Sequence, residues 1–416
     1  MATSKRRVKT IPKHSSCLNF KDYMPYFGAS LKSGFQKLSA ETVWHETLPK
    51  RKLIPAPTGR HALWYFMQFV DLKEGDEVLF AGYNFYIIVR LVVQRGCKPV
   101  FVDIDPETLC MDPDDLEKKI TPKSRCVMVT HMFGNPGDLT RISEICQKND
   151  LLLFEDCAHA VGTTHNGEQV GQAGDGALFS FGIQKLINSF GGGLLAIKKE
   201  WVEGKPLPEH NVGGSGPFFD TFSRVLTSFM TTPKFYGYTY YPGLNFAMKM
   251  ADNGRPQLKA VLDPSKDDPN YRFEQHSRAP FKPFMLRMHQ LQLKRALTNI
   301  ARRREIIARI KERVAEVPEI KVLNEDKHGQ TNASYFGVYA SRTKELAQHL
   351  AEHGVEANPQ EYYNCSQLEQ FSEFKADCPH SAYASTHVLR LPSYPWLSDG
   401  EVEHIADSIV SFYKSD

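Results

Sequence analysis

Phe154-Glu-Asp156-Cys-Ala-His159-Ala-Val-Gly162 and Ser180-Phe-Gly-Ile-Gln-Lys185 are the two most informative runs of this chain. The first run ends an apolar stretch that begins at Leu151, and it places a carboxylate, Asp156, three positions before a histidine. The second run places Lys185 among small and apolar residues, 29 positions after Asp156 and shortly before three consecutive glycines. Taken singly, such residues are most often a surface lysine and an aspartate at a strand end, so their meaning depends on the pattern around them.

The chain from about residue 53 to residue 200 alternates between apolar stretches and helical ones. Strands that are apolar throughout and alternate with helices predict a mainly parallel sheet covered on both faces. In such sheets ligands bind beyond the carboxyl ends of the strands, and Asp103, His131 and Asp156 each follow a predicted strand. The predicted strands are Glu77–Phe80, Pro99–Val102, Cys126–Val129, Leu151–Phe154 and Leu194–Ile197, and a helix is predicted over Leu139–Asn149.

Composition indicates a globular protein with room for two domains. The 416 residues are 41% apolar and 24% charged, as is typical of folded domains. The net charge of 51 − 48 = +3 and the absence of a basic stripe in the sequence argue against nucleic-acid binding. The eight cysteines are scattered without metal-type spacing, so we expect reduced thiols, no metal site and a cytoplasmic location. We find neither a signal peptide nor a run of roughly 18–20 apolar residues that could span a membrane.

The pattern divides the chain into three parts. We expect residues 1–50 to form a polar, irregular arm that lies across a partner subunit, residues 51–275 to form a large cofactor-binding domain, and residues 276–416 to form a smaller α+β domain. Within the large domain, residues 204–275 form an insertion, and its segment 217–251 contains ten aromatic residues but only four charged ones. The helices expected in the small domain are Phe284–Val314, Lys344–His353 and Gly400–Tyr413.

A glycine at the start of a helix provides a candidate phosphate site. The run Pro57-Thr58-Gly59-Arg60-His61-Ala62 precedes an apolar helix, and backbone N–H groups and the helix dipole favour an anion at such a position. Helix capping by Thr58 alone is the commoner role for such a residue. Ser180 can add a hydroxyl to the same phosphate, and an aromatic residue of Tyr83-Asn-Phe85-Tyr86 can stack on a bound ring.

These residues together match the needs of pyridoxal phosphate (PLP) chemistry. That chemistry uses a lysine that forms a Schiff base and a carboxylate that keeps the pyridine nitrogen protonated. Lys185 is the expected Schiff-base lysine and proton carrier, and burial is expected to lower its pKa. Asp156 is the expected partner of the ring nitrogen. His159 is expected to hydrogen-bond the ring hydroxyl or to pack over the ring, with a purely structural histidine as the alternative.

The motifs of one known family run through most of the chain, and the chain resembles the DegT/DnrJ/EryC1/StrS sugar aminotransferases, which are fold-type-I PLP enzymes. The motifs that carry this resemblance are Thr58-Gly59, Gly75-Asp-Glu-Val-Leu, Pro99-Val-Phe-Val-Asp-Ile-Asp-Pro-Glu-Thr, Ile120-Thr-Pro-Lys, His131-Met-Phe-Gly-Asn-Pro-Gly-Asp-Leu, Glu155-Asp156, His159-Ala, Phe179-Ser180-Phe, Lys185, Gly192-Gly193, Leu293-Lys-Arg, Ala301-Arg-Arg-Arg-Glu and Leu391-Pro-Ser-Tyr-Pro-Trp-Leu-Ser-Asp-Gly-Glu-Val.

The resemblance implies a fold, a cofactor and a reaction. It implies an α/β large domain with a mainly parallel, seven-stranded sheet, a smaller α+β domain, and a homodimer with active sites at the interface. It also implies PLP as cofactor, glutamate or glutamine as amino donor and a nucleotide-linked keto sugar as acceptor. Relatives that dehydrate sugars carry histidine in place of Lys185, so this lysine favours transamination. The residues onto which the family's cofactor contacts fall are Phe85 for ring stacking, Asp156, His159, Ser180 for the phosphate, and Lys185 for the internal aldimine.

Three departures from the family pattern concern the phosphate and the acceptor. Thr58-Gly59-Arg60 stands where the family usually has Ser-Gly-Thr, so Arg60 joins the predicted phosphate loop. Ser277-Arg278-Ala279 replaces an Asn-Tyr-Arg segment that reaches the phosphate from the partner subunit, which makes Arg278 the candidate for that contact. The histidine that often lines the sugar site has no counterpart around Asn358–Asn364.

Two alternatives to amino transfer onto a nucleotide-linked keto sugar stay open. The same chemistry could serve a lipid-linked or other non-nucleotide ketone or aldehyde, with membrane contact through residues 217–251. A regulatory relative that binds PLP without turnover is the non-enzymatic alternative, against which Lys185 and Asp156 argue. The aromatic-rich segment could equally pack against the partner subunit.

Overall fold

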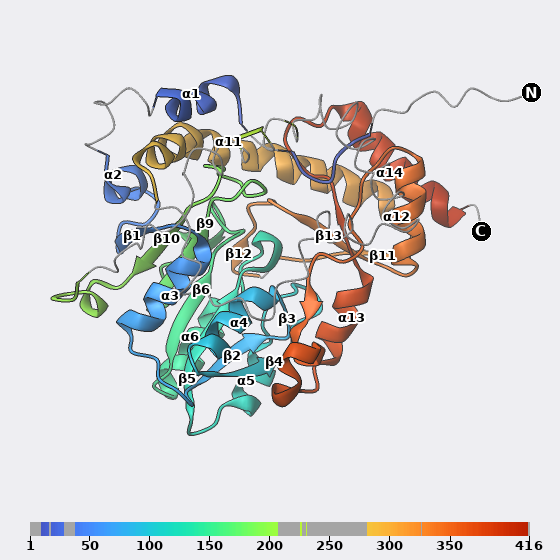
Figure 1. Ribbon diagram of the computed structural model, residues 1–416. Helices are drawn as coiled ribbons and strands as arrows, with labels where there is room; N and C mark the ends of the chain where they lie inside the picture. Colours follow the sequence, from blue (N-terminus) through green and yellow to red (C-terminus); the bar gives the residue numbers. More distant parts are fainter. Residues whose placement is uncertain are drawn as a thin grey trace, which may run out of the picture.

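A seven-stranded sheet forms the centre of the computed structural model, which describes residues 10–15, 18–28, 38–206, 225–226, 230, 281–325 and 327–414 (Figure 1). The strand order is β1-β10-β9-β6-β5-β2-β4. β4, β2, β5, β6 and β9 run parallel, whereas β10 is antiparallel to both β9 and β1. The strands are β1 (Lys52–Ala56), β2 (Glu77–Ala81), β4 (Lys98–Val102), β5 (Ser124–Thr130), β6 (Leu152–Asp156), β9 (Gly176–Ser180) and β10 (Gly193–Ile197).

The apolar strands bury side chains on both faces of this sheet. Phe80 and Met128 belong to one core cluster, while their neighbours Leu79 and Val127 belong to the other. Side chains alternate in this way because successive residues of a strand point to opposite faces. Helices α3 (Gly59–Phe69) and α4 (Tyr86–Gln94) contribute to the first cluster, and α2 (Ala40–Trp44), α5 (Pro113–Lys119) and α6 (Leu139–Lys148) contribute to the second. The predicted α/β fold with a mainly parallel sheet is confirmed.

A smaller antiparallel sheet with its own core lies beside the large one (Figure 1). Its order is β11-β13-β15, and the second half of the long helix α11 packs against it together with α12 and α14. The predicted long helix and the two later helices are present. The elements are β11 (Ile320–Val322), β13 (Phe336–Ala340), β15 (Val388–Leu391), α11 (Pro283–Val314), α12 (Thr343–Glu352) and α14 (Asp399–Lys414).

Segments from the second half of the chain also pack around the large sheet. β12 pairs with β7, and β14 pairs with β3. Strands that follow the predicted domain boundary therefore pair with strands that precede it. Helix α13 contacts β3 and β14, and its first residues donate hydrogen bonds to Asp103. The elements are β3 (Tyr83–Asn84), β7 (Thr164–His165), β8 (Glu168–Gln169), β12 (Gly329–Gln330), β14 (Tyr363–Asn364) and α13 (Pro379–His387).

The N-terminal region differs from the irregular arm expected for residues 1–50. Helix α1 (Phe20–Gly28) contacts α11, and α2 carries Trp44 completely buried beside Phe179 and Phe181. Residues 10–15 lie against the chain's own small domain, because the Ile11 N–H donates to the Gly354 carbonyl at 2.7 Å.

Most of the insertion lies outside the described residues, namely 207–224, 227–229 and 231–280. The predictions for the aromatic segment 217–251, for the boundary at 275/276 and for Arg278 therefore stay predictions. Among the helices that the structure describes, we find none that combines the length and the apolar character needed to cross a membrane.

The side chains of Arg302, Arg303 and Arg304 on α11 bind neighbouring segments of the chain. Arg303 is 2% exposed and donates to the backbone carbonyls of Ser334 and Ser393 at 3.4 and 3.2 Å. Arg302 pairs with Asp399, and Arg304 donates to the Thr331 carbonyl at 2.8 Å. The three side chains point in different directions around α11, so they hold the loop 330–334 and the segment 393–399 to one helix.

Replacing Arg303 by methionine should destabilise the fold. Arg303→Met keeps most of the apolar volume but removes the donors to two carbonyls, and we expect the free energy of unfolding to fall by about 2–4 kcal/mol. Urea titration followed by circular dichroism measures the change. Arg309→Met is the matched control because Arg309, on the same helix, makes ion pairs with exposed partners, and it should cost less than about 1 kcal/mol. Equal losses in the two variants would refute the assignment.

Candidate active site

A cavity of about 420 Å³ opens at the carboxyl ends of the parallel strands. Thr130 ends β5, Asp156 ends β6, and Gly182 follows β9, and all three line the cavity. The position follows from the fold, because parallel strands end at one edge and helices begin beyond it. Lys185, Asp156, His159 and Phe85, which were predicted from separate motifs, lie together in its wall.

Asp156 is buried at the end of β6, and one of its oxygens is already used by the backbone. Its Oδ1 accepts a hydrogen bond from the Ala158 N–H at 2.9 Å. Burial raises the pKa of the Asp156 carboxyl above its ordinary value, although the hydrogen bond from Ala158 and the nearby charge of Lys185 act against the rise. The carboxylate is therefore a strong acceptor that lacks a full counter-charge, and a protonated ring nitrogen would supply one.

Lys185 lies in the tight turn that follows β9. Its N–H donates to the Gly182 carbonyl at 3.0 Å, which closes the turn and directs the side chain into the cavity wall. Burial lowers the pKa of the Lys185 amine to about 8, while Asp156 and Glu361 limit the decrease. An amine with a pKa in this range gives up and regains a proton near neutral pH, which suits a general base.

His159 is held between two tyrosines. Its ring centroid lies 4.2 Å from that of Tyr335, and its Nε2 lies 3.0 Å from the Tyr362 hydroxyl. Burial, together with the charges of Lys185 and Arg390, lowers the pKa of His159 well below its ordinary value, so the ring is neutral. The His159 carbonyl accepts bonds from Asn332 at 2.7 Å and Ser334 at 2.8 Å. These contacts fix the ring against the cavity.

The predicted phosphate loop lies next to Ser180, although neither is among the residues that line the cavity. Thr58 caps α3 by accepting the His61 N–H at 3.4 Å. A Cβ added to Gly59 would lie 3.1 Å from the Ser180 Cβ, and one added to Gly193 would lie 2.3 Å from the Thr58 backbone. The loop therefore approaches β9 and β10 closely because these positions carry no side chain. Arg60 lies in the first turn of α3.

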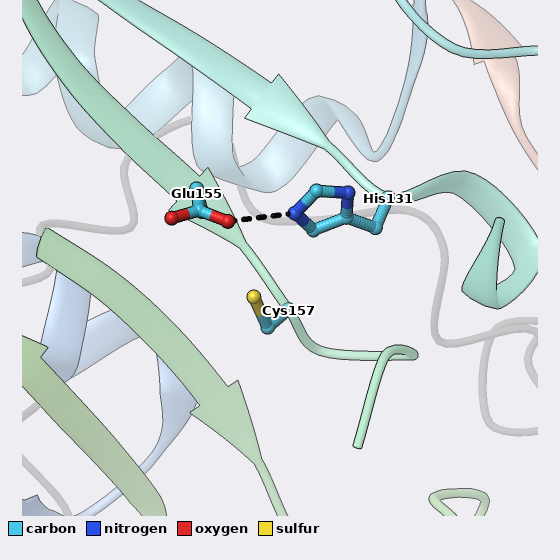
Figure 2. Close-up of side chains that lie close together, drawn as sticks. All are labelled: His131, Glu155 and Cys157. Carbon is cyan, nitrogen blue, oxygen red and sulfur yellow. Dashed lines mark hydrogen bonds and ion pairs between the residues drawn. The ribbon is translucent and has the colours of Figure 1, made fainter. Parts of the chain in front are cut away.

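Glu155, one residue before Asp156, anchors the edge of the site. Figure 2 shows its carboxylate facing His131, with Cys157 close by. Its Oε2 accepts from His131 Nε2 at 3.1 Å and from the Gly171 N–H at 2.7 Å, and its Oε1 accepts from the N–H groups of Ala173 and Gly174. His131 Nδ1 accepts the Gly137 N–H at 3.2 Å, so Nε2 carries the proton.

This anchor holds an ionised carboxylate in the interior. Burial alone would raise the pKa of Glu155, but the hydrogen bonds from His131 and the backbone N–H groups more than offset it, and the pKa lies below its ordinary value. Burial raises the pKa of the Cys157 thiol, so this side chain packs as a neutral group. The network connects β6, the turn after β5 and the loop 171–174 directly beside Asp156.

Several residues of the site were not found from the sequence. Tyr335, Glu361 and Tyr362 line the cavity, and all come from the second half of the chain. No local pattern distinguishes these residues from others of their type, because their position depends on how the small domain packs against the large sheet.

The pKa of Lys185 can be measured by chemical labelling. As pH rises through about 8, the buried amine loses its proton, and its rate of reductive methylation in the protein without cofactor should rise with a midpoint near pH 8. Peptide mass spectrometry reports the rate for each lysine. Asp156→Asn should move the midpoint downward, since the Asp156 charge raises the pKa of Lys185. A midpoint near the ordinary value of 10.5 would contradict the assignment.

Known proteins resemble this chain over most of its length. The chain is 26% identical over 374 residues to the dTDP-4-dehydro-2,3,6-trideoxy-D-glucose 4-aminotransferase of Saccharopolyspora spinosa, covering 88% of this chain and 86% of that protein. It is 27% identical to the GDP-perosamine synthase of Escherichia coli O157:H7, covering 85% and 84%. Both alignments span most of each protein, so the likeness includes both sheets.

Solved structures share the fold. An aminotransferase from Psychrobacter cryohalolentis superposes with a TM-score of 0.73 at 19% identity, covering 96% of this chain and 98% of that one. The sugar aminotransferase CalS13 from Micromonospora echinospora superposes with a TM-score of 0.72 at 18% identity, covering 96% and 99%. The model of one family matches residues 30–237 and 287–410. The chain belongs to the DegT/DnrJ/EryC1/StrS aminotransferase family.

Proposed function

We propose that this protein is a PLP-dependent aminotransferase that moves an amino group from glutamate or glutamine to a keto sugar. The observation that carries the proposal is the meeting of Lys185 and Asp156 in one buried cavity beyond the strand ends. Bound PLP supplies an electron sink for the carbon that gives up or receives the amino group. The acceptor class is supported by relatives whose names describe amino transfer in sugar metabolism.

The residues present fit the cofactor's parts. Asp156 lacks a full counter-charge and can bind the pyridine nitrogen, while neutral His159 can receive or donate one hydrogen bond at the ring hydroxyl. Phe85, 38% exposed at the cavity rim, offers an apolar ring face. Thr58, Gly59, Arg60 and Ser180 provide a helix start, a hydroxyl and a cation for the phosphate.

Lys185 is the residue to which we assign covalent attachment of the cofactor and proton movement. Its amine is the nucleophile, and with a pKa of about 8 roughly a tenth of it is unprotonated at neutral pH, far more than for an ordinary lysine. Once released by the donor amine, Nζ can take a proton from the substrate carbon and return it, since the buried turn holds it in the cavity.

The alternatives differ in acceptor and in turnover. A lipid-linked or other non-nucleotide ketone would use the same residues and differ only in what binds beyond the cavity. The segment 217–251, which motivates that alternative, lies mostly outside the described residues. A regulatory relative without turnover has no need of an amine with a lowered pKa beside a buried carboxylate, so we favour an enzyme.

We further propose a homodimer in which Arg278 of each subunit reaches the phosphate bound by its partner. Its basis is the resemblance stated from the sequence, because Arg278 lies outside the described residues. A guanidinium forms paired hydrogen bonds with phosphate, which suits that role.

Lysine and aspartate variants test the chemistry. Borohydride reduction of the holoenzyme should fix the cofactor to the peptide that contains Lys185, and Lys185→Ala should lose both this adduct and transamination. Asp156→Asn should keep the fold but lose roughly 100-fold or more in the rate of the donor half-reaction, because an amide cannot hold the ring nitrogen protonated. Lys199→Ala, at an exposed lysine, should behave as the unaltered enzyme. Full activity in Lys185→Ala would end the proposal.

The dimer and the phosphate contact have a separate test. Sedimentation should give a dimer, and Arg278→Ala should weaken PLP binding by about tenfold or more, as measured by fluorescence quenching. Arg287→Ala, at an exposed position of α11, serves as the control. A fully active monomer would refute the shared site, and unchanged PLP affinity in Arg278→Ala would remove that residue from it.

A further inference from the structure

The cavity offers a second fixed carboxylate, Glu361, that the proposed chemistry does not use. Glu361 lines the same cavity as Lys185, yet it comes from the loop between α12 and β14. In any aminotransferase both substrates occupy one cavity in turn, so the charge of its wall decides which donor and acceptor can share it. Glu361 is therefore in a position to discriminate between substrates.

Two hydrogen bonds hold the Glu361 carboxylate in place. Its Oε1 accepts from Arg390 Nη1 at 2.7 Å, and its Oε2 accepts from Asn358 Nδ2 at 2.5 Å. The two donors are themselves connected, because Asn358 and Arg390 form a backbone bridge with N–H···O bonds of 3.0 and 2.9 Å. Each carboxylate oxygen can accept two bonds, so acceptor capacity remains on a side chain that is 12% exposed.

Arg390 supports Glu361 from behind the cavity wall. Its guanidinium carbon lies 3.8 Å from the centroid of the Tyr335 ring, which lines the cavity, and its side chain is only 2% exposed. Burial would raise the pKa of Glu361, but Arg390 and the more distant Lys13 more than offset it, so the carboxyl stays ionised. Arg390 is itself not among the cavity-lining residues, and its guanidinium forms an ion pair with the Glu361 carboxylate.

Residues 11–14 lie against the segments that carry this wall of the cavity. Lys13 N–H donates to the Glu356 carboxylate at 3.1 Å, and Ile11 forms a bridge with Val355. His14 bonds to the backbone of Ile183, which lines the cavity, and burial together with Arg390 lowers the pKa of His14. The family model begins at residue 30, so these residues precede the matched part of the chain.

We propose that Glu361 is a specificity-determining residue that accepts a hydrogen bond from a neutral N–H or O–H group of each substrate, and that L-glutamine is therefore preferred to L-glutamate as amino donor. The inference rests on the proposed function. A carboxamide N–H of glutamine satisfies Glu361 in the first half-reaction, in which glutamine leaves as 2-oxoglutaramate. A ring hydroxyl of the keto sugar satisfies it in the second. The second carboxylate of glutamate would face a like charge, which disfavours it.

Single-turnover kinetics with the two donors test the preference. The holoenzyme is mixed with L-glutamine or L-glutamate, and absorbance follows conversion of the cofactor to its amine form. We expect kcat/KM to favour glutamine by about tenfold or more, and Glu361→Gln to reduce that ratio by about tenfold, mainly through KM. Glu369→Gln, at an exposed glutamate nearby in sequence, should leave the ratio unchanged. A preference for glutamate, or the same ratio in Glu361→Gln, overturns the proposal.

A second variant and a binding measurement keep the test independent of folding and of turnover. Glu361→Gln leaves Arg390 without its counter-charge, so Glu361→Gln/Arg390→Gln, which removes both charges, should show the same loss of preference. Calorimetry of the holoenzyme compares glutaric acid monoamide with glutarate, neither of which can donate an amine, and the monoamide should bind about tenfold more tightly. If no donor converts the cofactor, the proposed function fails while this binding comparison still decides the role of Glu361. Equal binding of the two probes overturns it.

Discussion

The burial of Lys185 and Asp156 in one cavity is the constraint on which the rest of the site depends. Desolvation lowers the pKa of the amine to about 8 and raises that of the carboxyl, so burial disfavours the charged form of each group. Burying such groups is costly unless a partner supplies the missing interaction. A cofactor that offers an aldehyde to the amine and a basic ring nitrogen to the carboxyl would supply both missing interactions.

The carboxylates beside this pair show how the fold maintains it. Glu155 stays ionised because four donors surround it, and it therefore acts as a rigid support for the strand that carries Asp156. Glu361 stays ionised because Arg390 and Asn358 hold it, but it faces the cavity. These three carboxylates thus differ in function because their hydrogen-bond partners differ.

The site is also where the two halves of the chain meet. The His159 carbonyl, which comes from the large sheet, is bonded by Asn332 and Ser334, and Ser334 in turn accepts a bond from Arg303 on α11. A Cβ on Gly134 would lie 2.1 Å from the Asn332 side chain, so this contact requires a glycine whose φ is +83°. The position of the small domain and the orientation of His159 therefore depend on each other.

The sequence by itself determined the parallel sheet, the long helix and the strand-end position of Asp156, because hydrophobic periodicity and strand ends are local properties. Lys185 and His159 were predicted from residue types in two short runs, and Phe85 was assigned through the family resemblance. The sequence did not reveal β1 and β9, which carry proline and glycine, nor the burial of Trp44 and Arg303. Only the tertiary structure decided that Tyr335, Glu361 and Tyr362 line the cavity and that Arg390 fixes the charge of Glu361. Tyr335 and Tyr362 contact residues of the large domain more than 150 positions away, and the packing of two sheets, which no local pattern encodes, brings these segments together.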